Sequence, residues 1–301
     1  MSASAASLRR KIASSGDLQS VVRTMKALAA SSISQYEASV LALGDYYRTV
    51  ELGLGACLRQ GGFGALREQQ PRDAAVVGVV VFGSDQGLVG QFNEVVVDFA
   101  VQSLTTRLDS VRLWAVGERA QARLLDAGLS TTQALPVPNS VQAIAPLVLR
   151  VLMQSEALHG RGRIDELHVF YNRPTPGAGY APIAQRLLPL DHDWLRGRTN
   201  VPWPTNMIAE VIGDNQATLR ALTHEFLFIS LFRACAESLA SENASRLAAM
   251  QRADKNIDER LEHLQEAFHR LRQSSIDEEL FDLVSGFEAL SARTDPNSGV
   301  A

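Results

Sequence analysis

A seven-residue repeat of apolar residues in the C-terminal quarter constrains the fold of this chain more than any other feature. Most positions reached by stepping alternately four and three residues from Leu222 to Glu278 are apolar or small, and 215–285 contains no proline or glycine. A repeat held over so many turns predicts one unbroken helix with a coiled-coil seam over 214–290. At 1.5 Å per residue this helix would be about 110 Å long. That is wider than an ordinary globular domain, so the helix must extend beyond its own domain or be enclosed by other proteins.

The predicted seam changes in character along the helix. Its middle is rich in alanine, which predicts the closest approach of a partner helix there (Ala236, Ala240, Ala244, Ala248 and Ala249). Beyond Ser275 the repeat gives way to an apolar tip made of Leu280, Phe281, Leu283, Val284, Phe287 and Leu290. This tip needs a cover, which is either its own chain folding back or another protein.

The same spacing recurs near the N-terminus, from Leu8 to Leu54. It predicts a second helix within 1–60, about 45 residues or 70 Å long, in which Gly16-Asp17 either breaks the first turns or caps a helix that starts there. Two segments with this repeat favour pairing as a coiled coil, in a direction that periodicity leaves open. Because the N-terminal helix is the shorter one, part of the C-terminal helix has no partner in its own chain.

Between these helices, 61–213 has the pattern of a small α/β domain. Strands are predicted at 74–82, 111–116, 166–171 and 183–190, and helices at 92–108, 118–127 and 141–159. This alternation is typical of a Rossmann-like domain with a largely parallel sheet. Residues 61–71 are predicted to contain a linker, and 291–301 to form a disordered tail.

Composition and charge exclude several classes of function. The formal net charge of −4 argues against nucleic-acid binding. The longest nearly unbroken apolar run, 74–82, is too short to span a bilayer, and the N-terminus lacks the apolar core of a signal peptide. Cys57 and Cys235 have no metal-ligand or CxxC spacing and are predicted to be buried thiols. We therefore predict no catalytic residue, no metal and no cofactor.

The stretch Gly83-Ser84-Asp85-Gln86-Gly87-Leu88-Val89-Gly90 is the only one with the pattern of a ligand site. Strand, glycines and helix in this order can present backbone N–H groups to a phosphate. However, the glycine spacing does not match GxGxxG, and no lysine in the chain follows a glycine as in a P-loop. We therefore interpret Gly83, Gly87 and Gly90 as residues of a structural turn, and expect valine at Gly87 or Gly90 to strain the backbone or clash.

Several motifs resemble the γ subunit of F-type ATP synthases. The most specific are Leu239-Ala240-Ser241-Glu242-Asn243-Ala244-Ser245-Arg246-Leu247-Ala248-Ala249-Met250 and 272–280. Further matches are Ser84-Asp85-Gln86-Gly87-Leu88-Val89-Gly90, 10–14 and Met25-Lys26-Ala27-Leu28-Ala29-Ala30. They occur in the family's order, at both ends and in the middle of the chain.

The resemblance implies a fold and a role. In the family the terminal helices form an antiparallel coiled coil, and the C-terminal helix fills the axis of a hexamer of α and β subunits. The α/β domain lies against the ε subunit and the c ring. One copy per complex would act as a non-catalytic shaft that couples ion-driven rotation of the c ring to ATP synthesis or hydrolysis at the β subunits. It would be a peripheral protein on the cytoplasmic face of the bacterial plasma membrane, without inserting into it.

The resemblance also implies contacts with the β subunits at Arg246, Gln273, Glu279, Met25 and Lys26. The alternative for Arg246 is an intrahelical pair with Glu242, four residues earlier. If Arg246 meets a β subunit, Arg246→Ala is expected to change the coupled rate with little effect on the stability of the isolated chain.

This sequence departs from the family where 31–36 replaces a basic cluster, where Val89 replaces a small residue or Cys, and in lacking the chloroplast cysteine insertion. These differences suggest a divergent branch, such as a second, sodium-type ATPase. Two other classes of function stay open, a stand-alone coiled-coil scaffold and a nucleotide-dependent enzyme using 83–90. A scaffold would be a stable homodimer, whereas an enzyme would bind nucleotide unaided.

Overall fold

The computed structural model describes residues 4–61, 76–104, 110–177, 179–190, 192–207 and 209–294. These residues fall into two compact units, one containing 4–26 and 250–294 and the other containing the described residues between 27 and 249. The predicted linker 61–71 lies outside these ranges from residue 62 onward. The predicted tail 291–301 lies outside them from residue 295 onward.

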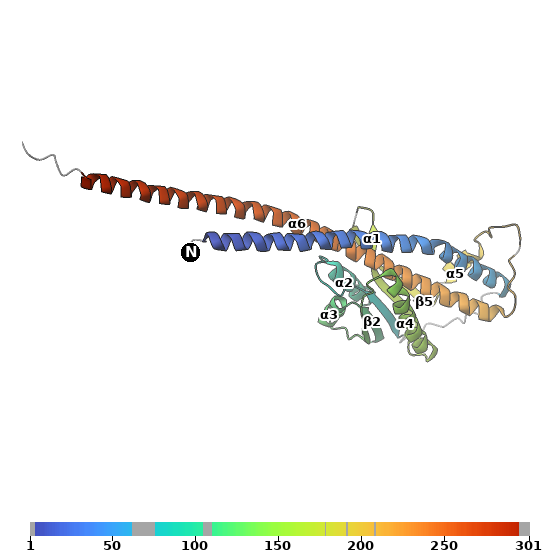
Figure 1. The fold of residues 1–301 in the computed structure, drawn as a ribbon. Coiled ribbons are helices and arrows are strands. Elements are labelled where there is room, and N and C mark those ends of the chain that lie inside the picture. The colour runs from blue at the N-terminus through green and yellow to red at the C-terminus, as the bar shows by residue number, and fades with distance from the viewer. Residues whose placement is uncertain are drawn as a thin grey trace, which may run out of the picture. The chain divides into compact units, whose positions relative to one another are not determined.

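Two long helices occupy the ends of the chain, α1 (Ala5–Gly61, 57 residues) and α6 (Asn215–Thr294, 80 residues), drawn in blue and in orange to red in Figure 1. Helix α1 neither breaks nor starts at Gly16, where a side chain would meet no atom within 4 Å. It is therefore longer than the 45 residues expected. Helix α6 begins after Asp214, whose Oδ1 accepts a hydrogen bond from the Gln216 N–H at 2.9 Å, as at a typical N-cap.

The two helices run antiparallel in each unit. In the first unit, Lys26 Nζ donates to Asp254 Oδ2 at 2.7 Å, and Gln19 donates to Asp258. In the second, Tyr46 and Cys57 of α1 contact Glu225 and Asn215 of α6, respectively. Residue numbers that rise along α1 therefore fall along α6.

The buried side chains of this pair follow the seven-residue repeat. On α1 they include Leu8, Val22, Ala29, Tyr36, Val50 and Leu54, and on α6 Phe226, Ile229, Ala236, Ala240, Met250 and Ile257. All of them occupy predicted seam positions, so the predicted coiled coil is confirmed.

The α/β domain contains one five-stranded sheet of order β3-β2-β1-β4-β5. Its strands are β1 (Val77–Phe82), β2 (Val111–Val116), β3 (Gln133–Leu135), β4 (Glu166–Thr175) and β5 (Gly179–Leu188). Strands β1 to β4 are parallel, and β5 pairs antiparallel with β4. The largely parallel sheet is as predicted, whereas β3 and the short helix α5 (His192–Thr199) were not expected.

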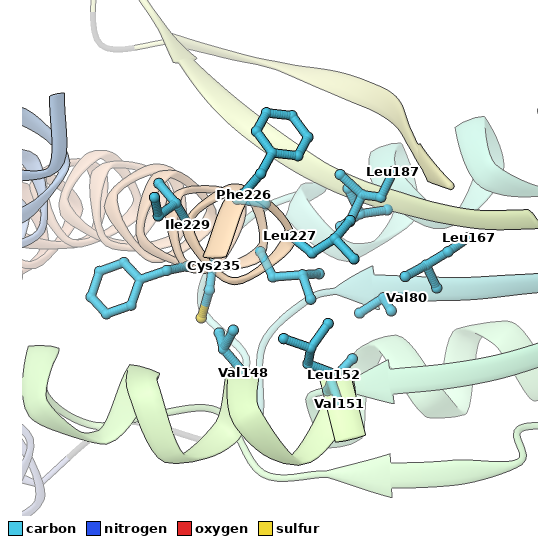
Figure 2. Close-up of a cluster of buried hydrophobic side chains, with 14 of the residues drawn as sticks. Val80, Val148, Val151, Leu152, Leu167, Leu187, Phe226, Leu227, Ile229 and Cys235 are labelled. Carbon is cyan, nitrogen blue, oxygen red and sulfur yellow. The ribbon is translucent and has the colours of Figure 1, made fainter. Parts of the chain in front are cut away.

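Helices cover both faces of the sheet. On one face, α2 (Phe92–Leu104) and α3 (Glu118–Asp126) bury Val96, Val97, Ala120 and Leu124 against the strands. On the other face, α4 (Val141–Gly160) and α6 form one core with strand residues such as Val80 and Val169. Figure 2 shows this second core. Its labelled residues include Val148, Val151 and Leu152 of α4, Leu227 and Cys235 of α6, and Val80 and Leu167 of the sheet.

Helix α4 is the one helix among the described residues that is long and apolar enough to cross a membrane. Its Ile144, Val148 and Leu152 side chains are fully buried in the core of the α/β domain. One face of α4 therefore packs within the domain, whereas Leu149 and Met153 on the same helix are exposed.

Candidate functional site

The glycine-rich turn after β1 directs its polar side chains to the protein's own backbone. Ser84 and Asn93, both buried, bind each other twice: the Ser84 N–H donates to Asn93 Oδ1, and Asn93 Nδ2 donates to Ser84 Oγ, both at 2.9 Å. The Asp85 carboxylate accepts the N–H groups of Glu118 at 3.0 Å and Val137 at 2.9 Å. Asp85 thereby connects the turn to the first residue of α3 and to the loop that follows β3. These groups stabilise the carboxyl edge of the sheet.

Two of the three glycines in this turn have a conformational or steric requirement. At Gly83 an added Cβ would lie 2.3 Å from the Ala120 Cβ, so helix α3 packs directly on this residue. Gly90 adopts φ +58, which L side chains rarely adopt. At Gly87, in contrast, φ is not positive and the nearest atom is Arg119 Nη2 at 3.9 Å. The expectation of strain or clash at Gly87 is therefore wrong, because this position faces open space.

The cysteines have the environment of structural thiols. Cys57 and Cys235 are both buried and unbridged, as predicted. Burial raises the pKa of both thiols, for Cys235 far above its ordinary value. A protonated, buried thiol is a poor nucleophile. Among the described residues, no group of three or more His, Cys, Asp or Glu side chains could hold a metal ion.

The motif from Ser241 to Arg246 lies on α6 where this helix meets the α/β domain. Ser241 Oγ donates to the Asn172 carbonyl of β4 at 3.0 Å, and Ser245 Oγ donates to the Val89 carbonyl of the turn. Arg246 donates from Nη2 to Glu242 Oε1 at 2.6 Å and from Nη1 to Asn243 Oδ1 at 3.2 Å. Most polar side chains of the motif are thus engaged within the chain.

The pair of Glu242 and Arg246 is buried, with 7% and 13% of the side chains exposed. Glu242 Oε2 and Arg246 Nε have no hydrogen-bond partner among the described residues. Burial raises the pKa of Glu242, and the Arg246 guanidinium opposes this shift. Tyr36 of α1 also has a raised pKa, first because of its burial and also because it lies near Cys235 and the Glu242 carboxylate. Removing Arg246 would leave a buried carboxylate without its cation, so the expected independence of chain stability from Arg246 is not supported.

Met25 and Lys26 lie on α1 in the unit formed by both chain ends, and both are half-buried. Lys26 Nζ and Arg23 Nε contact the Asp254 carboxylate of α6 at 2.7 and 3.3 Å. The hydrogen bond from Lys26 is the main cause that lowers the pKa of Asp254. Lys26 therefore stabilises the pairing of the two helices.

Gln273 and Glu279 are exposed on α6, in its last third. Between and beyond them, large apolar side chains are also exposed, including Ile276 (46%), Leu280 (54%), Phe281 (72%), Leu283 (71%) and Val284 (57%). Phe287 and Leu290 of the predicted tip have side chains outside the described set. The described part of the tip is thus uncovered by its own unit.

One charged cluster was missed by the sequence reasoning. The buried Glu237 carboxylate accepts Arg173 Nε at 2.8 Å and Arg233 Nε at 2.7 Å. The spacing of Arg233 and Glu237, four residues apart, was a visible signal for half of it. Arg173 lies 64 residues earlier on β4, and only the fold brings it to Glu237.

These features define a class of protein: two long terminal helices, paired antiparallel and joined to a small α/β domain, with motif residues that bind the chain itself. Comparison with known proteins agrees. The family model of ATP synthase matches residues 4–290. The ATP synthase gamma chain of Moorella thermoacetica is 28% identical, over 94% of this chain and 98% of its own length. That of Leifsonia xyli is 25% identical, over 94% and 97%.

Solved structures share the fold. A chain of the Euglena gracilis mitochondrial ATP synthase, from an OSCP/F1/c-ring structure, superposes with a TM-score of 0.63 at 14% identity over 98% of this chain and 97% of its own. A chain of the central stalk and c ring of Tetrahymena thermophila gives 0.56 at 20% identity over 77% and 99%. The chain belongs to the ATP synthase family, in its γ-chain branch.

Proposed function

We propose that this chain is the central rotor shaft of an F-type ATP synthase. In this role it couples ion-driven rotation of a membrane c ring to ATP synthesis or hydrolysis at the β subunits, without catalysing the reaction itself. The observation that carries the proposal is the exposed apolar end of α6, where Phe281 and Leu283 are more than two-thirds exposed. Burying such a side chain is worth about 1.5 to 3 kcal/mol. A hexamer of α and β subunits around this end would supply the missing cover.

The remaining partners follow from the same role. The ε subunit and the c ring would bind the α/β domain, and each complex would contain one copy of the chain. The complex would lie on the cytoplasmic face of a bacterial plasma membrane. Support comes from the bacterial γ chains among the relatives and from the central-stalk and c-ring assemblies that contain the similar folds.

The structure limits how Arg246 can meet a β subunit. Removing the cation from a buried ion pair costs about 3 to 5 kcal/mol, whereas a new charged hydrogen bond contributes about 1.5 to 3 kcal/mol. Breaking the Arg246–Glu242 pair would therefore cost more free energy than a new hydrogen bond from Arg246 to a β-subunit carboxylate would contribute. We propose that Arg246 keeps its bond to Glu242 and offers its remaining N–H groups to the partner.

The other residues proposed to contact the β subunits differ in whether they already have a partner within the chain. Gln273 and Glu279 are exposed and can meet β-subunit loops without losing an internal partner described for them. Lys26 is held by Asp254, so its contribution to a β contact competes with the pairing of α1 and α6. Met25, half-buried beside it, can add apolar contact.

Co-purification tests the proposal. The chain, co-expressed with the α and β subunits of its own organism and carrying the only affinity tag, is expected to retain one αβ hexamer per copy. A stable homodimer of the chain with no hexamer would favour a scaffold. Binding of ATP by the isolated chain would favour an enzyme that uses the turn at 83–90.

A further inference from the structure

A small cavity lies where α1, α6 and strands β4 and β5 meet, within the unit that contains the α/β domain. Its volume is about 300 Å³, at the lower end of the range for small-molecule sites. The described residues that line it are Tyr47, Arg173, Ile183, Ala184, Gln185, Ser230 and Arg233. Most of these side chains can donate hydrogen bonds, and none of them is a carboxylate. We call it the arginine cavity.

The two arginines of the cavity share one carboxylate and keep other donors free. Arg173 donates from Nε to Glu237 and from Nη2 to the Tyr171 hydroxyl. Arg233 donates only from Nε, also to Glu237. Neither Nη group of Arg233 nor Nη1 of Arg173 has a hydrogen-bond partner among the described residues. Two guanidinium groups against one carboxylate leave one net positive charge in this cluster.

Two neutral side chains add further donors to the arginine cavity. Ser230 is only 5% exposed, and its Oγ has no hydrogen-bond partner in the described part of the chain. A buried hydroxyl without a partner lowers stability, and a ligand that accepts a hydrogen bond from it would remove this cost. Gln185 is half-buried on β5, and no hydrogen bond of its side chain to another described residue is present. The donors therefore outnumber the acceptors available to them.

We propose that the arginine cavity binds a phosphate group. Its donors come from α6, β4 and β5, and a tetrahedral phosphate has acceptor oxygens that point in several directions. The two oxygens of a carboxylate, in contrast, match a single arginine fork. Arginine is well suited to phosphate because its guanidinium is planar, always charged and only weakly hydrated. The proposed rotor function requires no small ligand on this chain, so this inference goes beyond that function and does not depend on it.

An adjoining cavity bears on the source of the phosphate group. It has a volume of about 540 Å³, shares Tyr47, Ala184 and Gln185 with the arginine cavity, and is also lined by Trp194 and Phe226. The rings of Trp194 and Phe226 pack with their centroids 4.6 Å apart. Nucleobases stack on aromatic side chains. The phosphate group can therefore be the free ion or part of a nucleotide whose base occupies the second cavity.

Calorimetric titration of the full chain with inorganic phosphate, and separately with ADP, at constant ionic strength tests the proposal. Arg233→Gln is expected to weaken binding about tenfold or more, because a charged hydrogen bond is lost. Glu237 keeps Arg173 in this variant, so the fold should persist. Arg233→Lys keeps the charge without the planar fork and should bind with intermediate affinity. Ser230→Ala removes a hydroxyl that has no partner among the described residues, so it should weaken binding severalfold with little effect on folding.

Arg220→Gln is the matched control. Arg220 is exposed on the same helix and does not line the arginine cavity, so removal of its charge should leave binding unchanged. ADP binding that is tighter than phosphate binding and is weakened by Arg233→Gln would identify a nucleotide as the source and place it here, not at the turn 83–90. Phosphate binding that is as tight as ADP binding would identify the free ion.

Three results would overturn the phosphate site. They are no binding of either ligand at millimolar concentration, binding unchanged in both Arg233→Gln and Ser230→Ala, and equal weakening by Arg220→Gln. Each of these results would leave the assembly of the chain with the hexamer untouched, so failure of this inference is distinguishable from failure of the rotor function.

Discussion

Replacing Arg246 by Ala should destabilise the chain, by an amount that grows with pH. The substitution leaves Glu242, 7% exposed, without its cation, while Oε2 already has no partner among the described residues. The Glu242 carboxylate can avoid being a buried charge without a counter-charge only by taking up a proton. From an ordinary pKa of about 4.3, this costs about 4 kcal/mol at pH 7 and about 1 kcal/mol at pH 5. Because the folded-state pKa of Glu242 is raised, stability is lost as pH rises, and this is the expected sign.

The assay is urea unfolding of the full chain at both pH values, with Lys255→Ala as the control. Lys255 and Glu259 have the same four-residue spacing on α6, but their side chains are 79% and 57% exposed. This control should lose at most about 0.5 kcal/mol at either pH. The double variant Arg246→Ala/Glu242→Gln should recover much of the loss at pH 7. An Arg246→Ala loss no larger than that of Lys255→Ala, or one independent of pH, would refute this account of the buried pair.

Three further predictions concern the turn, the helix pair and the tip. Gly90→Val should destabilise the domain by about 1 to 2 kcal/mol, because φ +58 is unfavourable for a side chain, whereas Gly87→Val should be neutral in the same thermal melts. The lowered pKa of Asp254 means that its contribution to helix pairing is present above about pH 4 and lost as pH falls further. Circular dichroism should show the acid transition shifted by Asp254→Asn, and an unchanged transition would count against it. Deleting the residues after Asp282 should reduce hexamer binding in pull-downs while leaving the α/β domain folded, and undiminished binding would show that the tip is dispensable.

The long-range architecture could be predicted because the seven-residue repeat is a strong local signal. Seam positions such as Val22, Ala29 and Ile257 are buried where the repeat places them. The helix direction could not be obtained in this way, since an apolar seam is compatible with either direction. Polar pairs such as Tyr46 with Glu225 identify the antiparallel arrangement, and they are recognisable only in the folded chain. Strand β3, with three residues, is too short for a periodic pattern to develop.

The chemistry of the motifs was harder to predict than their location. The pattern at 83–90 predicts a strand-to-helix connection, which the structure confirms, but Gly87 has none of the constraints found at Gly83 and Gly90. The role of Asp85 depends on Val137, which lies 52 residues further along the chain. The intrahelical alternative for Arg246 followed from its spacing to Glu242. The burial that makes this pair costly to break depends on residues distant in the sequence, and both Tyr36 of α1 and Asp85 of the turn lie near enough to Glu242 to affect its pKa or have theirs affected by it.

The most direct test of the rotor function is to observe rotation of this chain. With the αβ hexamer immobilised and a bead fixed to the α/β domain, addition of ATP should drive continuous rotation in one direction. The bead should pause once per turn for each catalytic β subunit. A bead that only fluctuates about one angle while the same complexes hydrolyse ATP would contradict the account, because the chain would then be a bound but static component.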